Sequence, residues 1–300
     1  MKKKTYLFAL MAMALTLGSC SDNENGIGGE TSKYITVSTS IGNMTRVATD
    51  EKGGQTFEEG DEISVYAWTG DATVAPETSE RVVNNAINKL TNGSWVSTPQ
   101  MLWKNNRDKH YFIGVYPTAA ISDLSAGEYT FDANKQTESD LLVAVNPDGL
   151  SYNVDEPQTV PLTFTHVMAK LVVNLTYKNQ WGGIPTVEKV VVGNAAKEAT
   201  INYLTKVVTP STTAKEDFSL PEITENTKYV SVIIPQEEVT QLTIVIGGKN
   251  FVYDNGTPFK LESGKITTVN LEVGRDEIKL GDVKITNWED GSTFSGEALN

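Results

Sequence analysis

Apolar and polar side chains alternate along most of the chain, which is the pattern of half-buried β-strands. The stretch KYITVSTSIG shows it clearly, because Ile35, Val37, Thr39 and Ile41 share one face and small hydroxyl side chains occupy the other. The alternation ends at the Gly42-Asn43 turn. Further strands are predicted at residues 62–68, 109–117, 128–133, 140–145, 187–194, 229–235, 242–248, 250–255 and 265–273.

Two segments allow more than one prediction. Residues 81–90, RVVNNAINKL, fit either a short helix or a strand. Residues 161–177, PLTFTHVMAKLVVNLTY, are long enough for two strands or for one bent strand. Apolar residues at helical spacing are otherwise scarce, so we expect little helix in the protein.

The C-terminal segment DEIKLGDVKITNWEDG changes its alternation part-way along. Its first two apolar residues share one parity and its next two share the other. A bulge or kink at Gly281-Asp282, where the parity changes, would return all of them to one face. We therefore predict a two-part strand that ends near Trp288. Its apolar residues are Ile278, Leu280, Val283 and Ile285.

Many short strands separated by Gly, Pro, Asn and Asp turns are typical of β-sandwich domains. The predicted fold class is therefore all-β. Pro157 and Pro161 mark a boundary near residue 160. They divide the folded part into an N-terminal domain at residues 47–160 and a C-terminal domain at residues 161–300.

Composition agrees with a folded protein and limits its partners. Apolar residues make up 39% of the 300 residues and charged residues 21%, which is enough apolar content for a packed core. The formal net charge is −13, and the chain has no basic cluster with interleaved aromatic residues. Because phosphates and anionic lipid headgroups repel such a surface, nucleic acid is not an expected partner.

Residues 1–19 are typical of a cleaved export signal. A basic start is followed by the apolar core TYLFALMAMALTLG, which is too short to span a bilayer comfortably. The one cysteine of the chain, Cys20, comes next and cannot form an intrachain disulfide. Its context Leu17-Gly18-Ser19-Cys20 resembles the bacterial lipobox, in which the cysteine thiol receives a diacylglycerol. The alternative is an incidental free thiol.

Residues 21–32, SDNENGIGGETS, predict a flexible tether after this cysteine. Their acidic start resembles the segment that sends some Gram-negative lipoproteins to the outer surface. Two or three acyl chains hold a protein stably on a membrane where one does not. We therefore expect a precursor that is lipid-anchored in the outer membrane and exposed on the cell surface.

The residue types that most enzymes need are scarce, since the chain has 2 histidines and 1 cysteine. His166 shares its face with Phe164 and Met168, which favours a packed core histidine over a catalytic base. His110 has no serine or cysteine near it in a nucleophile motif. No Cys or His pair has metal-ligand spacing, and no Gly-rich phosphate loop is present. We therefore expect no catalytic residue, no metal, no cofactor and no enzymatic activity.

Two other groups of residues allow a binding role. The acidic run EEGDE at residues 58–62 fits a solvated turn better than a cation site. Trp95, Trp103 and Trp181 can stack on sugars, but each can equally pack against a sheet.

Several local patterns together resemble one family. EEGDEISVYAW, HYFIGVYP, SDLLVA, LTFTHVMAKLVVNL, LESGKITTVNLEV and ITNWEDG occur in this order along the chain. Each pattern is degenerate alone, but their order and spacing are similar to those of the fimbrillin-like, type V pilin family. The resemblance covers most of the chain after residue 33. It implies two transthyretin-like β-sandwich domains in tandem and export as a lipoprotein.

The resemblance also implies a mode of assembly. In polymerising members, an arginine-specific protease removes the N-terminal strand, and a strand from another subunit fills the vacated groove. Arg46 in NMTRVA matches that cleavage position, so the cut falls between Arg46 and Val47 and residues 20–46 form a propeptide. The apolar tail at residues 277–290 has the alternation that a donor strand needs. The expected partners are other fimbrial subunits, and the expected role is adhesion.

Three alternatives remain open at this point. Arg46 can be an ordinary loop arginine, in which case the protein stays anchored through Cys20 as an anchor subunit or as a monomeric glycan-binding lipoprotein. The tail can be the protein's own last strand, as in a tip subunit that receives a donor strand and offers none. The sequence therefore does not distinguish between the stalk, tip and anchor roles.

Overall fold

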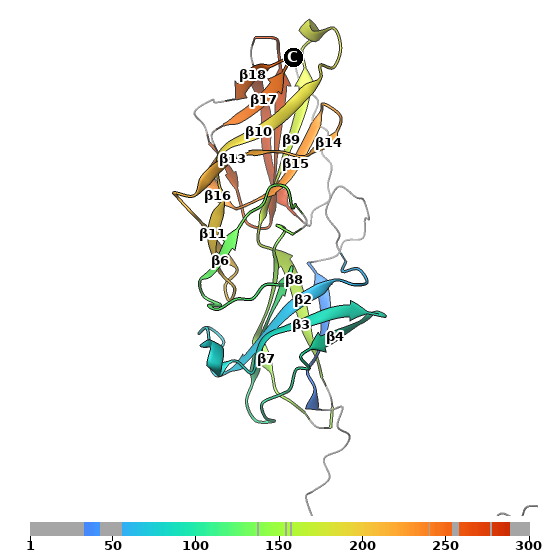
Figure 1. The fold of residues 1–300 in the computed structure, drawn as a ribbon, viewed down its shortest axis with the longest axis vertical. Coiled ribbons are helices and arrows are strands. Elements are labelled where there is room, and N and C mark those ends of the chain that lie inside the picture. The colour runs from blue at the N-terminus through green and yellow to red at the C-terminus, as the bar shows by residue number, and fades with distance from the viewer. Residues whose placement is uncertain are drawn as a thin grey trace, which may run out of the picture.

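The structure is a computed structural model (Figure 1), and it describes residues 33–42, 56–136, 138–153, 155–156, 158–239, 241–253, 258–276 and 278–288. Nearly all its regular structure is β-strand, which confirms the all-β prediction. The strands of the first half are β1 (Thr36–Ile41), β2 (Glu62–Thr69), β3 (Val83–Thr91), β4 (Ser94–Thr98), β5 (His110–Tyr116), β6 (Gly127–Thr130), β7 (Leu142–Leu150) and β8 (Thr159–His166). Those of the second half are β9 (Ala169–Tyr177), β10 (Val187–Ala196), β11 (Glu198–Asn202), β12 (Val207–Pro210), β13 (Lys215–Ser219), β14 (Glu222–Thr224), β15 (Lys228–Ile233), β16 (Gln236–Val239), β17 (Leu242–Ile246), β18 (Lys249–Tyr253), β19 (Phe259–Leu261), β20 (Lys265–Val273) and β21 (Ile278–Asn287). Two short 3₁₀ helices are η2 (Thr78–Glu80) and η3 (Asn179–Trp181).

Seven strands of the first half form one sheet in the order β1-β8-β7-β5-β2-β3-β4. The sheet curls, so that its two edges approach each other. The N–H of Ile35, just before β1, donates to the carbonyl of Met101, just after β4, at 2.9 Å. The inner face of this curled sheet carries an apolar core with residues from β1, β2, β3, β5, β7 and β8. We call this cluster the inner core.

Two sheets pack face to face in the second half. One has the order β14-β15-β9-β20-β21 and the other β13-β10-β17-β18. Val173 and Val269 from the first sheet and Val192 and Ile244 from the second belong to the same buried cluster. This half is therefore a β-sandwich, as its alternating strands predict.

The two halves are joined by more than the chain between them. β6 of the first half pairs with β11 of the second in a three-stranded sheet, β12-β11-β6. The sandwich core also continues onto the outer face of the curled sheet, where it includes Tyr66, Trp68 and Ile113. Figure 1 shows the result as an elongated molecule with the halves end to end and β6 beside β11 at the middle.

The chain leaves the first sheet later than the expected boundary at residue 160. β8 covers residues 159–166 and belongs to the curled sheet, whereas β9 begins the sandwich at Ala169. Pro161, which suggested the boundary, lies inside β8. It is tolerated there because it lies beyond the part of β8 that pairs with β7, which begins at Phe164. The change of sheet therefore falls at Val167-Met168.

The structure also decides the ambiguous segments. Most of residues 81–90 form the strand β3. Residues 161–177 divide into β8 and β9, which lie in different sheets. In the tail, Asn270 pairs with Asp282 and Leu271 with Leu280, so that Gly281 is the extra residue of a bulge. The predicted irregularity at Gly281-Asp282 is thus confirmed.

Candidate functional site at the first strand

β1 forms one edge of the curled sheet and pairs with β8 in parallel. The register runs from Thr36 opposite Thr159 to Ile41 opposite Phe164. Because parallel neighbours are never joined by a tight hairpin, β1 meets a strand that is distant in sequence. All residues from Gly42 onward follow β1 along the chain, so one cut after β1 would leave it bound by noncovalent contacts alone.

The inward side chains of β1, together with that of Ile35 just before it, are part of the inner core. Ile35 is 2% exposed and Val37 is 6% exposed. Burial of side chains of this size stabilises a protein by about 1.5–3 kcal/mol each. Removal of β1 would therefore expose apolar surface on the strands beneath it.

The outward side chains of β1 make weaker contacts. The Oγ1 atoms of Thr36 and Thr159 lie 3.2 Å apart, and the Ser40 hydroxyl donates to Thr163 Oγ1 at 3.2 Å. These hydroxyl pairs are exposed to solvent. They support the register of β1 but contribute much less than its buried side chains.

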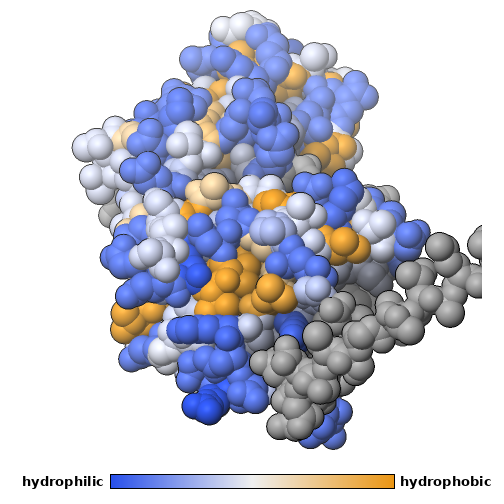
Figure 2. Space-filling view, turned by 60° about the horizontal axis from the view of Figure 1, so that its bottom comes forward, coloured by the Kyte–Doolittle hydropathy of each residue, from blue (hydrophilic) through white to orange (hydrophobic). Residues whose placement is uncertain are grey.

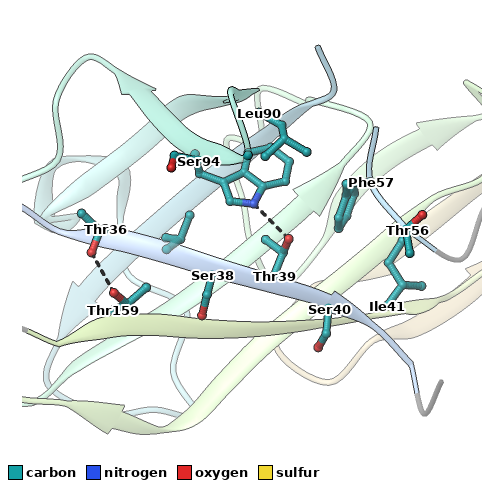
Figure 3. A pocket seen from close by; sticks show the side chains of 13 residues that line it. Thr36, Ser38, Thr39, Ser40, Ile41, Thr56, Phe57, Leu90, Ser94 and Thr159 are labelled. Carbon is teal, nitrogen blue, oxygen red and sulfur yellow. Dashed lines mark hydrogen bonds between the residues drawn. The ribbon is translucent and has the colours of Figure 1, made fainter. Parts of the chain in front are cut away.

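A groove of about 640 Å³ runs along β1, on the side away from β8 (Figure 3). Across it, Trp95 of β4 donates its Nε1–H to Thr39 Oγ1 at 3.0 Å, the dashed line that ends on Thr39 in Figure 3. Phe57 lies at the end of the groove near Ile41, and its ring meets the ring of Trp95 edge-on at 5.3 Å. Most of the side chains that line the groove carry hydroxyl groups, and the aromatic rings among them are those of Phe57 and Trp95.

The backbone of β8 depends on β1 for its hydrogen bonds on this side. Gly42 donates its N–H to the carbonyl of Phe164 at 2.8 Å. Because backbone groups alternate between the two sides of a strand, those of Val160 and Leu162 also point toward β1. Without β1 they would form an unpaired edge above an open apolar groove, which is a template for another strand.

The C-terminal strand β21 lies at the edge of the sandwich, antiparallel to β20. The bulge at Gly281 lets Ile278, Leu280 and Val283 pack, partly buried, against the sandwich core, whereas Ile285 remains 39% exposed. In this structure the tail is therefore the protein's own last strand.

The sequence predicted that the strand of the tail ends near Trp288, but not what Trp288 contacts. Trp288 is 2% exposed, and its ring lies on that of His166 at the end of β8. The His166 Nδ1 lies 2.8 Å from Asp140 Oδ1. This confirms the packed, hydrogen-bonded histidine predicted from the pattern. The only sequence signal for Trp288 was a large aromatic residue at the end of an alternating strand.

Three predicted site residues, Cys20, Arg46 and Val47, lie outside the described residues. The strand β1, which the structure describes, precedes Arg46 along the chain, and the groove lies beside β1.

The second histidine is also structural. His110 is fully buried; its Nε2 accepts from the Lys104 N–H at 3.1 Å, and its Nδ1 lies 3.1 Å from the Asp108 carbonyl. Burial lowers the pKa of His110 below its usual 6.5, because the charged imidazolium would lose its hydration. This arrangement suits a neutral ring with one donating and one accepting nitrogen, and not a base that faces a substrate.

The remaining candidates also make contacts within the protein. Trp103 stacks on Tyr152 at 6.1 Å, and Trp181 donates to the Val273 carbonyl at 2.9 Å. In the acidic turn, Glu59 Oε1 accepts from the Asn92 N–H at 2.6 Å. Across residues 33–288, the described parts of the chain contain no group of three His, Cys, Asp or Glu side chains able to hold a metal. No helix among the described residues is long and apolar enough for a membrane span.

The comparison that decides the family is with sequence profiles. The profile of the fimbrillin-like family matches residues 45–288. The chain belongs to the fimbrillin-like family. This confirms the resemblance of the local patterns. No curated protein matches the fimbrillin-like chain significantly.

Solved structures share the fold of this fimbrillin-like chain. A putative cell adhesion protein from Bacteroides uniformis is 20% identical with a TM-score of 0.63, and the match covers 87% of this chain and 100% of that one. One from Bacteroides ovatus is 17% identical with a TM-score of 0.64 and coverages of 85% and 98%. A fimbrial protein from Bacteroides vulgatus is 13% identical with a TM-score of 0.52 and coverages of 84% and 99%.

Proposed function

We propose that the protein is a structural subunit of a cell-surface fimbrium and serves in adhesion. The family supports this role, and proteins of similar fold carry the descriptions "cell adhesion protein" and "fimbrial protein". In the proposal, the precursor is exported and anchored in the outer membrane through acyl chains on Cys20. The mature subunit, which begins at Val47, is part of the fimbrium.

The observation that carries the proposal is the position of β1. It lies at a sheet edge, supplies Ile35 and Val37 to the inner core, and precedes Arg46 along the chain. Cleavage between Arg46 and Val47 allows β1 to leave together with the lipid anchor. The unpaired edge of β8 then accepts a strand from another subunit, whose alternate side chains fill the vacated sites.

The donor in this proposal is the tail, with Ile278, Leu280, Val283 and Ile285 as its apolar side chains. One subunit then gives a strand at its C-terminal end and receives one at its first strand. Such contacts are heterologous and do not close on themselves, so repetition produces a filament.

One observation favours a second candidate, a subunit that receives a strand but gives none. β21 pairs with β20 along its whole length, and Trp288 at its end is buried. A tail this firmly held in its own sheet suits a tip subunit, or an anchor subunit that also keeps β1 and its lipid.

The structure gives less support to glycan binding and to catalysis. Trp95, Trp103 and Trp181 each contact another aromatic ring of the protein. An aromatic platform for sugars needs an exposed ring face. Neither histidine has the surroundings of a catalytic base.

N-terminal sequencing of protein sheared from the cell surface tests the proposal. A start at Val47 is expected for a polymerising subunit, and Arg46→Ala should stop assembly but not export. Arg107→Ala removes an exposed arginine elsewhere and is the matched control. An unchanged ladder of polymers from Arg46→Ala, or a native start at lipidated Cys20, would contradict strand removal.

A further inference from the structure

The inward positions of β1 do not have the same surroundings. Ile35 and Val37 lie in the apolar inner core. Thr39, the next inward residue, instead accepts a hydrogen bond from Trp95 Nε1 at 3.0 Å. An indole N–H is a donor only, and this one is partly buried and points at β1 (Figure 3). Any strand that replaces β1 therefore meets two apolar sites followed by one hydrogen-bond donor.

We propose that Trp95 selects the replacement strand by requiring a hydrogen-bond acceptor at its third inward position, and that the tail of a second copy of this chain provides that acceptor. This inference rests on the strand exchange proposed above. An apolar side chain at the third position would bury the indole N–H without a partner, which disfavours that strand. A serine, threonine or asparagine satisfies it.

The tail contains a matching series when it lies parallel to β8, as β1 does. In this register, Val283, Ile285 and Asn287 take the places of Ile35, Val37 and Thr39. Two β-branched apolar residues enter the inner core, and the Asn287 amide oxygen faces Trp95 Nε1. The outward positions of Thr36 and Ser38 receive Lys284 and Thr286, which tolerate solvent, and the outward position of Ser40 receives Trp288. The fourth inward position falls on Glu289 in place of Ile41, so the match covers three positions.

A second register would place Ile278, Leu280 and Asp282 at the same three sites. It is less favourable for two physical reasons. It brings a carboxylate charge into a partly buried site, which costs desolvation. It also leaves only residues 274–277 to connect β20 with the donated strand, a reach of about 13 Å, whereas the Val283 register leaves residues 274–282, about 30 Å.

Strand displacement tests the inference. A site for a sequence-specific protease replaces residues 43–49, and the folded chain is cut there once, so that a fluorescently labelled β1 segment stays bound noncovalently. Peptides of residues 280–290 are then titrated, and release of the labelled segment is followed by fluorescence anisotropy. The native peptide should displace β1, and the Asn287→Leu peptide should need about tenfold more peptide. The Asp282→Leu peptide is the matched control and should equal the native one.

The same titration in a Trp95→Phe chain isolates the hydrogen bond. Phenylalanine keeps an aromatic ring but has no N–H, so the native and Asn287→Leu peptides should now displace β1 equally well. Equal displacement of β1 by these two peptides in the native chain would overturn the inference. Weaker displacement by the Asp282→Leu peptide alone would also overturn it, because that result indicates the other register.

A peptide of residues 33–42, with the sequence of β1 itself, separates this inference from the proposed function. If that peptide exchanges but the tail peptide does not, the tail is the wrong occupant while strand exchange stands. If neither peptide exchanges, the groove does not accept strands and the proposed function fails with it.

Discussion

The indole of Trp288 lies flat on the imidazole of His166, with ring centroids 4.1 Å apart and ring planes 5° apart. His166 ends β8 of the curled sheet, whereas Trp288 follows β21 of the sandwich. The backbone N–H of Trp288 also donates to the Gly264 carbonyl at 3.1 Å. The stack thus fastens the end of the C-terminal strand at the junction between the two halves.

Trp288→Ala should loosen β21. Loss of a buried aromatic side chain of this size costs about 3–5 kcal/mol of the free energy of unfolding. In the Trp288→Ala variant, hydrogen exchange of the β21 amides should become faster than in the native protein. Exchange of the amides of β9, which lies inside the sheet, should change less. Trp288→Phe keeps a ring on His166 and should retain most of the protection. Native protection of β21 in Trp288→Ala would show that the strand ladder alone holds the tail.

Ile35→Ala should weaken the attachment of β1. The substitution removes a buried side chain from the inner core and should lower the free energy of unfolding by about 2–5 kcal/mol. Denaturant titration measures this change. Ser38→Ala on the exposed face of the same strand should stay within about 0.5 kcal/mol of the native protein. Equal effects of the two variants would mean that β1 adds little to the core.

Gly114→Ala should destabilise the core beneath β1. Gly114 lies in β5, and a Cβ atom there would come within 2.6 Å of Cζ of the fully buried Phe164 ring. Overpacking of this kind costs about 1–3 kcal/mol, because the fully buried ring must shift to make room for the added methyl group. Thermal unfolding measures the effect. A glycine in open space, such as Gly93, is a poor control because its φ of +73° is itself strained for alanine, so Ala144→Gly serves as the comparison for backbone effects.

His110 should make stability fall in mild acid. Its pKa is lowered in the folded protein, so the unfolded chain binds a proton near pH 6.5 while the folded chain does so only at lower pH. The stabilisation is therefore complete above pH 6.5 and is lost as the pH falls from 6.5 toward the folded-state pKa. Unfolding titrations between pH 8 and 5, about one unit apart, should show a smaller decrease in His110→Gln than in the native protein. The same decrease in both would assign the acid sensitivity to other groups.

Cys20→Ser should abolish attachment of fatty acid to the precursor. Serine has no thiol to receive the diacylglycerol, so labelled palmitate supplied to cells should appear in the native precursor and be absent from the variant. Ser19→Ala keeps a small residue before the cysteine and should leave labelling intact. Labelling of Cys20→Ser would place the acyl chains elsewhere.

Local alternation predicted most of the longer strands because it depends only on which face of each strand is buried. It missed the short strands β4, β11, β12, β13, β14, β16 and β19. Residues 33–42 predicted β1 with its inward Ile35 and Val37, and the parity change at Gly281 predicted the bulge in β21. Residues 81–90 stayed ambiguous because their apolar spacing fits either period. The change of sheet falls at Val167-Met168, after the prolines near residue 160, because prolines mark local breaks in pairing whereas the change of sheet depends on partners distant in the chain.

By itself the sequence determined the all-β class, the inward residues Ile35 and Val37, the order of the family's local patterns, and the positions of Cys20 and Arg46. Only the tertiary structure decided that β1 lies parallel to β8, that Trp95 donates to Thr39, and that Trp288 stacks on His166. The physical reason is one of range. Alternation is a property of neighbouring residues, whereas these contacts join residues 56 and 123 positions apart, or opposite halves of the chain, and form only when the sheets close.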